Sequence, residues 1–204
     1  MRLVLTLLCP YHWPLWIHES ARRRSSALQL MEDGTEGPAE ASWPVDAVLF
    51  NEFMKWHIRP SLSANTDYMK RVVGEDMRPC LNFHPKTALL AKALLHSIKE
   101  NTLIIEAAPG DAEQVCAFSM AKRACPFRLR AAEPLPEGYE SLDNWLPVCS
   151  STRNRVICVC NFYTYARYVV QGIVKANLTV VYWKLNEHRL SINKARLGMP
   201  LENV

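Results

Sequence analysis

The sequence predicts an α/β fold with a mostly parallel sheet and helices on both of its faces. The first observation is the segment 102–134, in which an apolar run ends at Glu106, a tight turn and a helical stretch follow, and a second apolar run ends at Glu133. The second is an amphipathic helix just before this segment, and the third is the alternation of apolar runs with helical spacing after it. Strands that alternate with helices are typical of parallel sheets.

The first half of the chain supplies the elements on which this prediction rests. Apolar residues at helical spacing predict a short helix over 45–58. A cleaner helix begins at Pro85, because proline is favoured at a first helical position, where its missing N–H has no partner to lose. A strand over 103–105 follows, and the spacing of apolar residues after the turn predicts a helix over 112–120.

The second half continues the alternation. Alternating apolar residues predict a strand over 127–131, and the Pro- and Ser-rich stretch 134–154 is interpreted as a connection. The run VICVC at 156–160 predicts a buried strand, and the spacing of valines and isoleucine over 169–174 predicts a helix. The β-branched and aromatic run 178–183 is the most strand-like of the chain.

The domain organisation is predicted to be a leader and linker over 1–44, followed by one domain over 45–204. The first 31 residues are rich in arginine and poor in acids, which resembles an organellar transit peptide and predicts a mitochondrial location. An unstructured leader without address function and a secretory signal are the alternatives. Seven cysteines without a C-x-x-C pair indicate reduced thiols in an intracellular compartment.

Other functions are disfavoured by composition and spacing. The histidines lack the spacing of metal ligands, so no metal site is expected. No apolar run is long enough for a transmembrane helix. The net charge of +4 permits contact with nucleic acid without requiring it.

The predicted strand ends carry the polar groups that suggest a ligand. Ligands of parallel sheets bind at the carboxyl ends of strands, and an acid such as Glu133 suits a ribose diol. The turn lacks G-K-[ST], which favours an adenosyl ligand without phosphates, such as S-adenosylmethionine (SAM). Asn161 suits an exocyclic amine, and Phe162 and Tyr163 could stack on a base. Each of these groups also has an interpretation without a ligand. In that interpretation the acids are solvated residues at strand ends, Asn161 is a turn residue, and the aromatic rings pack in the core.

Five segments together resemble a known family. They are LNFHPKTALLAKAL (81–94), LIIEAAPGDA (103–112), LRAAEP (129–134), VCNFYTY (159–165) and YWKLNEHRLSINKARLG (182–198). In this order they are similar to the ribosomal RNA adenine dimethyltransferases and their mitochondrial transcription factor B relatives. The resemblance implies a Rossmann-like SAM-dependent methyltransferase fold. Alanines 108 and 112 stand where the family has glycines, and Tyr163-Thr164 replaces its Pro-aromatic pair.

The resemblance also implies roles for individual residues. The implied catalytic residues are Asn161, Phe162 and Tyr163, and the implied SAM-binding residues are Asn82, Glu106, Ala108, Gly110 and Glu133. The expected function is that of a mitochondrial rRNA adenine dimethyltransferase-like protein. Its expected partners are RNA, or mitochondrial DNA and the transcription machinery, and enzymatic activity is left open. The alternatives are a ribose 2′-O-methyltransferase-like enzyme and a non-catalytic binding module on a Rossmann-like scaffold.

Overall fold

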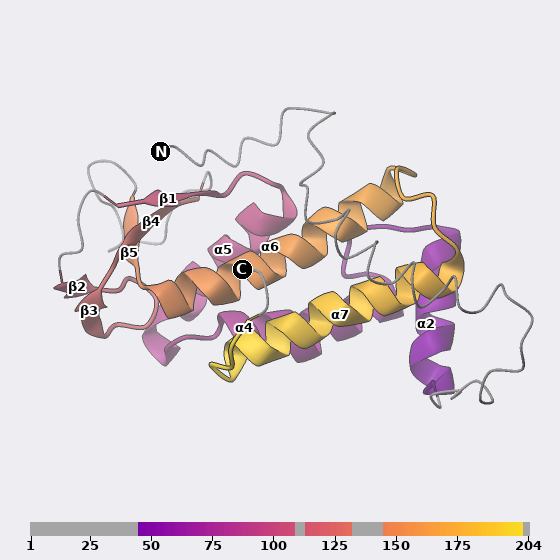
Figure 1. The fold of residues 1–204 in the computed structure, drawn as a ribbon, viewed down its shortest axis with the longest axis horizontal. Helices are drawn as coiled ribbons and strands as arrows, with labels where there is room; N and C mark the ends of the chain where they lie inside the picture. Colours follow the sequence, from indigo (N-terminus) through magenta and orange to yellow (C-terminus); the bar gives the residue numbers. More distant parts are fainter. Residues whose placement is uncertain (1–44, 109–112, 132–144, 202–204) are drawn as a thin grey trace, which may run out of the picture. The chain divides into compact units, whose positions relative to one another are not determined.

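The computed structural model describes residues 45–108, 113–131 and 145–201 (Figure 1). The helices and strands described below lie in one compact unit that includes Ala47–Val204. Its N-terminal half is helical, a short stretch of antiparallel strands follows, and two long helices complete it. The helical elements of the first half are α2 (Ala47–Ile58), α3 (Asp67–Arg71), η1 (Val72–Met77), α4 (Arg78–Leu81), η2 (Pro85–Thr87) and α5 (Ala88–Lys99). The remaining elements are β1 (Ile104–Ala107), β2 (Glu113–Val115), β3 (Lys122–Ala124), β4 (Phe127–Arg130), β5 (Leu146–Val148), α6 (Ser150–Val170) and α7 (Leu178–Arg196).

Elements α3, η1 and α4 follow one another without a break and form one helical rod with a π-helical middle. Thr66 caps its N-terminus, where its hydroxyl accepts a hydrogen bond from the Met69 N–H at 3.4 Å. Within η1 the helix is wider, and the N–H of Arg78 donates to the carbonyl of Val73, five residues earlier. A π-helical turn of this kind inside an α-helix is often found at functional sites.

All three strands of the main sheet are antiparallel, in the order β1-β4-β5. Glu106 on β1 is paired with Arg128 on β4, and the Arg128 side chain donates to the Glu106 carboxylate at 2.6 Å. A separate hairpin of β2 and β3 has three exposed residues on each strand. Strand β5 leads directly into α6, whose first residue is Ser150. The sheet is therefore placed at the N-terminal end of α6, as Figure 1 shows.

Helices α6 and α7 form an antiparallel hairpin that provides much of the core (Figure 1). The loop between them ends at Asn177, whose side chain caps α7 by accepting a hydrogen bond from the Val180 N–H at 2.9 Å. The buried side chains of the two helices recur every three or four residues, as amphipathic packing requires. Those of α6 are Thr152, Val156, Cys158, Val159, Phe162, Tyr163, Ala166 and Val169, and those of α7 are Val181, Tyr182, Leu185, Ile192 and Ala195.

Two arginines of α6 join this hairpin to the shorter helices by capping their C-terminal ends. The Arg155 guanidinium donates to the carbonyl of Cys80 at 2.6 Å and lies 4.2 Å from the centre of the Phe83 ring. Arg167 donates to the carbonyl of Lys99, at the end of α5, at 3.0 Å. Positive charge at a helix C-terminus is favourable because unpaired carbonyls concentrate negative charge there. The caps therefore fix α4 and α5 against α6.

The predicted α/β fold with a mostly parallel sheet is wrong. The helices predicted over 45–58 and from Pro85, and the strands predicted over 103–105 and 127–131, are present with shifted ends, but the two strands pair antiparallel. The predicted strands 156–160 and 178–183 lie inside α6 and α7. The helix predicted over 169–174 is also wrong, because α6 ends at Val170 and a loop follows.

The segment between the strands predicted over 103–105 and 127–131 also differs from the prediction. In place of the helix predicted over 112–120, the described residues form β2 and a turn. That turn contains Met120 in a left-handed backbone conformation with φ of 57°. Since β1 and β4 are antiparallel, the crossover helix that a parallel pair needs is not required between them.

His188 on α7 is a titratable residue that lies against α6. Its ring lies 5.5 Å from that of Tyr165 on α6. Burial and, to a smaller extent, the positive charge of Lys184 lower the pKa of His188, Glu187 opposes them, and the net result is a pKa of about 4. The folded protein therefore keeps this imidazole neutral at a pH at which an unfolded chain, with a histidine pKa near 6.5, already binds a proton.

We expect the free energy of unfolding to fall as the pH drops from about 6.5 to about 4, because the unfolded state takes up the proton that the folded state refuses. A pKa lowered by this amount corresponds to a loss of about 2–3 kcal/mol. Urea unfolding of the wild type and of His188→Phe across this range measures the effect. The variant keeps a ring at the position and shares the titrating carboxylates, so the difference between the two curves isolates His188. A pH-independent difference would contradict the prediction.

Candidate functional site

The residues predicted to be catalytic lie together in the middle of α6. Phe162 and Tyr163 are 0% and 2% exposed, with ring centres 6.2 Å apart and ring planes nearly perpendicular. Burial raises the pKa of Tyr163 to about 12. Asn161 is partly buried. Phe162 and Tyr163 therefore contribute to the core, and a catalytic role for these three residues stays a prediction.

The residues predicted to bind SAM are spread over other elements. Asn82 follows the last residue of α4, and its carbonyl accepts from Arg155 at 3.3 Å. Glu106 lies in β1, and the backbone N–H of Ala108 donates to the carbonyl of Pro126 at 2.9 Å. Gly110 and Glu133 lie outside the described residues.

The described members of the predicted site thus lie at the end of α4, on or just after β1, and within α6. Glu106 is not held by a predicted neighbour but by Arg128. Arg128 and Arg130 in turn lie 4.5 and 4.9 Å from the centre of the Trp145 ring. Stacking of guanidinium groups on an indole is favourable. Binding of SAM by the predicted residues stays a prediction.

Three buried thiols gather near the N-terminus of α6. The hydroxyl of Thr152 lies 3.4 Å from the sulfur of Cys116 and 3.3 Å from that of Cys149. Burial raises the pKa of Cys125 to about 11. Burial also acts to raise the pKa of Cys149, but hydrogen bonds from Ser151 and Thr152 outweigh it and lower that pKa to about 6. The six cysteines of the described part of the chain are free thiols.

Among the described residues, these thiols and the other potential ligands do not come together as a metal site. Within residues 45–108, 113–131 and 145–201, no set of three or more His, Cys, Asp or Glu side chains is arranged to hold a metal ion. The same residues include no helix with the length and apolar character needed to cross a bilayer.

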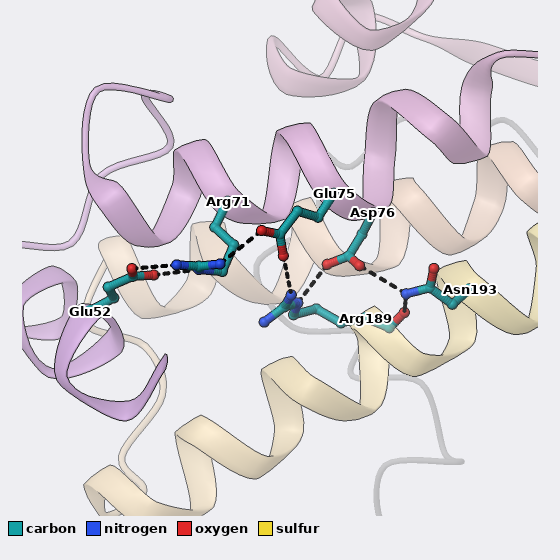
Figure 2. A network of polar contacts seen from close by, with 6 residues as sticks. All are labelled: Glu52, Arg71, Glu75, Asp76, Arg189 and Asn193. Carbon is teal, nitrogen blue, oxygen red and sulfur yellow. Dashed lines mark hydrogen bonds and ion pairs between the residues drawn. The ribbon is translucent and has the colours of Figure 1, made fainter. Parts of the chain in front are cut away.

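A network of charged side chains joins α2, the π-helical turn and α7 (Figure 2). Arg71 makes two hydrogen bonds of 2.7 Å to the carboxylate of Glu52 on α2, and a third of 2.8 Å to Glu75. Asp76 accepts from Arg189 on α7 at 2.5 Å and from the Asn193 side chain at 2.8 Å. Two-pronged contacts between arginine and a carboxylate fix the orientation of both groups.

Two acids of this network lie on the π-helical turn η1. Glu75 and Asp76 are consecutive, and both face Arg189, with the Glu75 carboxylate 3.8 Å from its guanidinium. Asp76 is only 5% exposed, so its charge is compensated inside the protein. The network fixes the approach of α7 to the helical rod. The sequence contains no local signal for this network, because 61–79 and the tail from Lys184 show only scattered polar and charged residues.

The opposite face of α7 carries apolar side chains that are exposed. Val180, Trp183, Leu190 and Leu197 expose 46%, 44%, 56% and 68% of their surface. We call these four residues the α7 stripe. On a helix they lie within about 100° of one another, since each residue turns by about 100°. Exposed apolar side chains that line up on one face, rather than lying scattered, are typical of a protein interaction surface.

Comparison with known proteins places this structure in a family. Residues 43–199 match the family described as "Rabin 8-like C-terminal domain". The proteins named "Guanine nucleotide exchange factor for Rab-3A" are similar to the chain: the rat protein is 31% identical over 169 residues, which is 79% of this chain and 42% of the relative. The human protein is 30% identical over 168 residues, which is 76% of this chain and 41% of the relative. The chain thus spans about two fifths of the length of these relatives.

These matches correct several predictions. The resemblance to rRNA adenine dimethyltransferases and mitochondrial transcription factor B proteins is wrong, and so are the methyltransferase function and the RNA or mitochondrial DNA partners drawn from it. The motifs behind that resemblance were short, and two of them were interpreted as strand ends that are in fact the interiors of α6 and α7. The mitochondrial location and the division at residue 44 stay predictions.

The family model covers residues 43–199, a span that runs from just before α2 to just beyond α7 and takes in the described helices and strands. The chain belongs to the Rabin 8-like C-terminal domain family.

Proposed function

We propose that this chain is a Rab-binding module that takes part in guanine nucleotide exchange. The observation that carries the proposal is the identity of 31% and 30% with two exchange factors for Rab-3A over more than three quarters of the chain. Because the chain spans about two fifths of those proteins, their exchange activity does not transfer to it as a whole. Binding of a Rab GTPase is the narrower function that a shared domain supports.

The rigidity of the described helices supports a role in binding. The long α6–α7 hairpin is fixed by caps and by the charged network, so the described helices form a rigid support. A rigid helical face lowers the entropy that association costs. Nucleotide exchange needs no nucleophile or resident metal on the exchange factor. It needs tighter binding of the nucleotide-free GTPase than of the loaded one, and the two affinities are linked reciprocally.

The experiment is to measure binding of the purified chain to Rab-3A in the GDP-bound, GTP-analogue-bound and nucleotide-free states. We expect saturable binding that differs between states by about tenfold or more, which corresponds to about 1.4 kcal/mol. A Ras-type GTPase in the same three states is the control and is expected not to bind. Absence of binding to Rab-3A in every state would refute the proposal.

Release of a fluorescent GDP analogue from Rab-3A, measured with the same protein, separates two forms of the function. Acceleration of release with increasing chain concentration would place exchange within this domain. Binding without acceleration would make the chain a docking module whose catalytic partner lies elsewhere. Both results keep Rab binding, so the two readouts test different parts of the proposal.

A further inference from the structure

The α7 stripe has the spacing of a helix-pairing surface. Trp183, Leu190 and Leu197 are separated by seven residues each, and Val180 lies one turn before Trp183. A seven-residue repeat keeps side chains on one seam of a helix, where a second helix can pack along it. From Val180 to Leu197 the seam is about 26 Å long, at 1.5 Å per residue. The side chains that α7 buries, such as Leu185 and Ile192, lie on its other face.

Two charged residues occupy the same seam at the positions left by the apolar ones. Glu187 lies seven residues after Val180, and Lys194 lies seven residues after Glu187. The Glu187 side chain is 41% exposed and is held toward Lys184 at 3.1 Å. Along the seam the order is therefore apolar, aromatic, acidic, apolar, basic, apolar. This order is not symmetric, so it distinguishes the two directions in which a second helix could run.

We propose that the α7 stripe binds the α7 stripe of a second copy of this chain, with the two helices antiparallel about a two-fold axis. The axis passes between residues 188 and 189, which places Val180 opposite the partner's Leu197 and Trp183 opposite the partner's Lys194. Glu187 then faces the partner's Leu190 and lies diagonally next to the partner's Lys194. In an isologous interface each contact occurs twice, so one pairing of this kind uses the whole seam of both helices.

Charge complementarity selects this arrangement. In the antiparallel pair each Lys194 lies between the Trp183 ring and the Glu187 carboxylate of the other subunit, where a cation–π contact and an ion pair both favour it. A parallel pair would place Glu187 against Glu187 and Lys194 against Lys194, which is repulsive. Antiparallel helices also oppose their macrodipoles. A second copy carries the complementary surface by construction, which commits the stripe to this occupant.

The test measures the oligomeric state of the full chain, without any GTPase, by sedimentation equilibrium over a range of concentrations. We expect a monomer–dimer equilibrium for the wild type. Leu190→Glu is expected to weaken dimerisation by tenfold or more, because the substituted position lies next to the axis and brings two new acids beside Glu187. Leu89→Glu is the matched control: Leu89 is 68% exposed but belongs to α5 and is not part of the stripe, so this variant should dimerise like the wild type.

A charge exchange tests the direction of the helices. Glu187→Lys and Lys194→Glu are each expected to weaken the dimer, and the double variant is expected to restore it, because the opposite charges face each other again across the axis. Circular dichroism confirms that each variant keeps its helical content. A wild type that stays monomeric, a Leu190→Glu variant that still dimerises, or a double variant that is no tighter than the single ones would overturn the proposal.

The result is independent of Rab binding. If the wild type and Leu190→Glu are both monomeric, and the substitution abolishes binding of Rab-3A, the stripe is the Rab surface and not a dimer interface. If dimerisation follows the expected pattern while Rab-3A does not bind, the dimer stands and the proposed function fails.

Discussion

Replacing Arg189 by methionine is expected to lower the free energy of unfolding by about 3–5 kcal/mol, the cost of leaving a buried charge without its partner. The Asp76 side chain is 8% exposed and that of Arg189 is 14% exposed, and the hydrogen bond between them is 2.5 Å long. Methionine keeps most of the aliphatic volume, so the loss reports on charge rather than on a cavity. The Asn193 amide, which also donates to Asp76, cannot compensate a full negative charge.

The matched control removes a positive charge, that of a lysine, from an exposed ion pair. Lys99 contacts Glu100 at 3.2 Å, with 38% and 47% of the two side chains exposed. Lys99→Met is expected to change the free energy of unfolding by less than about 1 kcal/mol, because solvent screens such pairs. Urea unfolding curves for wild type and both variants give the comparison. In the double variant Asp76→Leu/Arg189→Met, the buried charge is gone, and much of the lost stability should return. Equal effects of the two methionine variants would refute the role assigned to burial.

The elements that the sequence predicts correctly are those whose signal is complete within one short segment. The helix from Pro85 combines a favourable first residue with a clear apolar face, and β4 alternates over a few residues. In both cases the pattern and its start lie side by side. Local propensity then agrees with the final structure, and no distant contact is needed to decide the type of element.

Helix α6 shows why a short window fails. The run VICVC is apolar and β-branched, and a five-residue apolar run does not distinguish a buried strand from part of a buried helix. The helical period becomes visible only when Thr152, Val156, Val159, Phe162 and Val169 are considered together. Tertiary packing of that long face, and not the local preference of Val156 or Ile157, determines the structure.

Part of helix α7 was also predicted to be a strand, although the sequence contains a signal for the start of a helix. The run 178–183 favours a strand by composition, but Asn177 stands directly before it and is a preferred N-cap residue. Leu185 and Ile192 continue the apolar face beyond the run. Once 178–196 is a helix, the seven-residue spacing of Trp183, Leu190 and Leu197 can be read from the sequence, whereas in a strand it has no meaning.

The antiparallel topology removes the geometric reason for which Glu106 and Glu133 were grouped, while their roles stay predictions. Carboxyl ends of parallel strands meet at one edge of a sheet, which is why Glu106 and Glu133 were expected to share a ligand. In the antiparallel pair β1–β4, those ends point in opposite directions, and Glu106 is instead paired with Arg128 across the ladder. The charged network was beyond prediction for a different reason: Glu52, Asp76 and Arg189 are far apart in sequence, and only the packing of three helices brings them together.

Phe162→Ala is expected to lower the free energy of unfolding by about 3–5 kcal/mol, the cost of removing a large aromatic side chain from a packed core. The Phe162 ring is 0% exposed and lies edge-on to Tyr163 in the middle of α6, so its loss leaves a cavity between α6 and its neighbours. Trp183→Ala is the matched control, because it removes an even larger ring from a position that is 44% exposed. Its expected effect is about 1 kcal/mol or less at protein concentrations at which the chain is monomeric.

The pair of variants also separates two roles for an aromatic side chain. A ring that stacks on a substrate loses binding when it is truncated and leaves stability nearly unchanged, whereas a core ring loses stability first. Urea unfolding at low protein concentration measures the stability of both variants, and sedimentation at high concentration measures association. We expect Phe162→Ala to act on unfolding and Trp183→Ala to act on association. A stable Phe162→Ala variant would contradict the packing seen in α6, since a fully buried phenyl ring cannot be removed without loss of its contacts with the surrounding core.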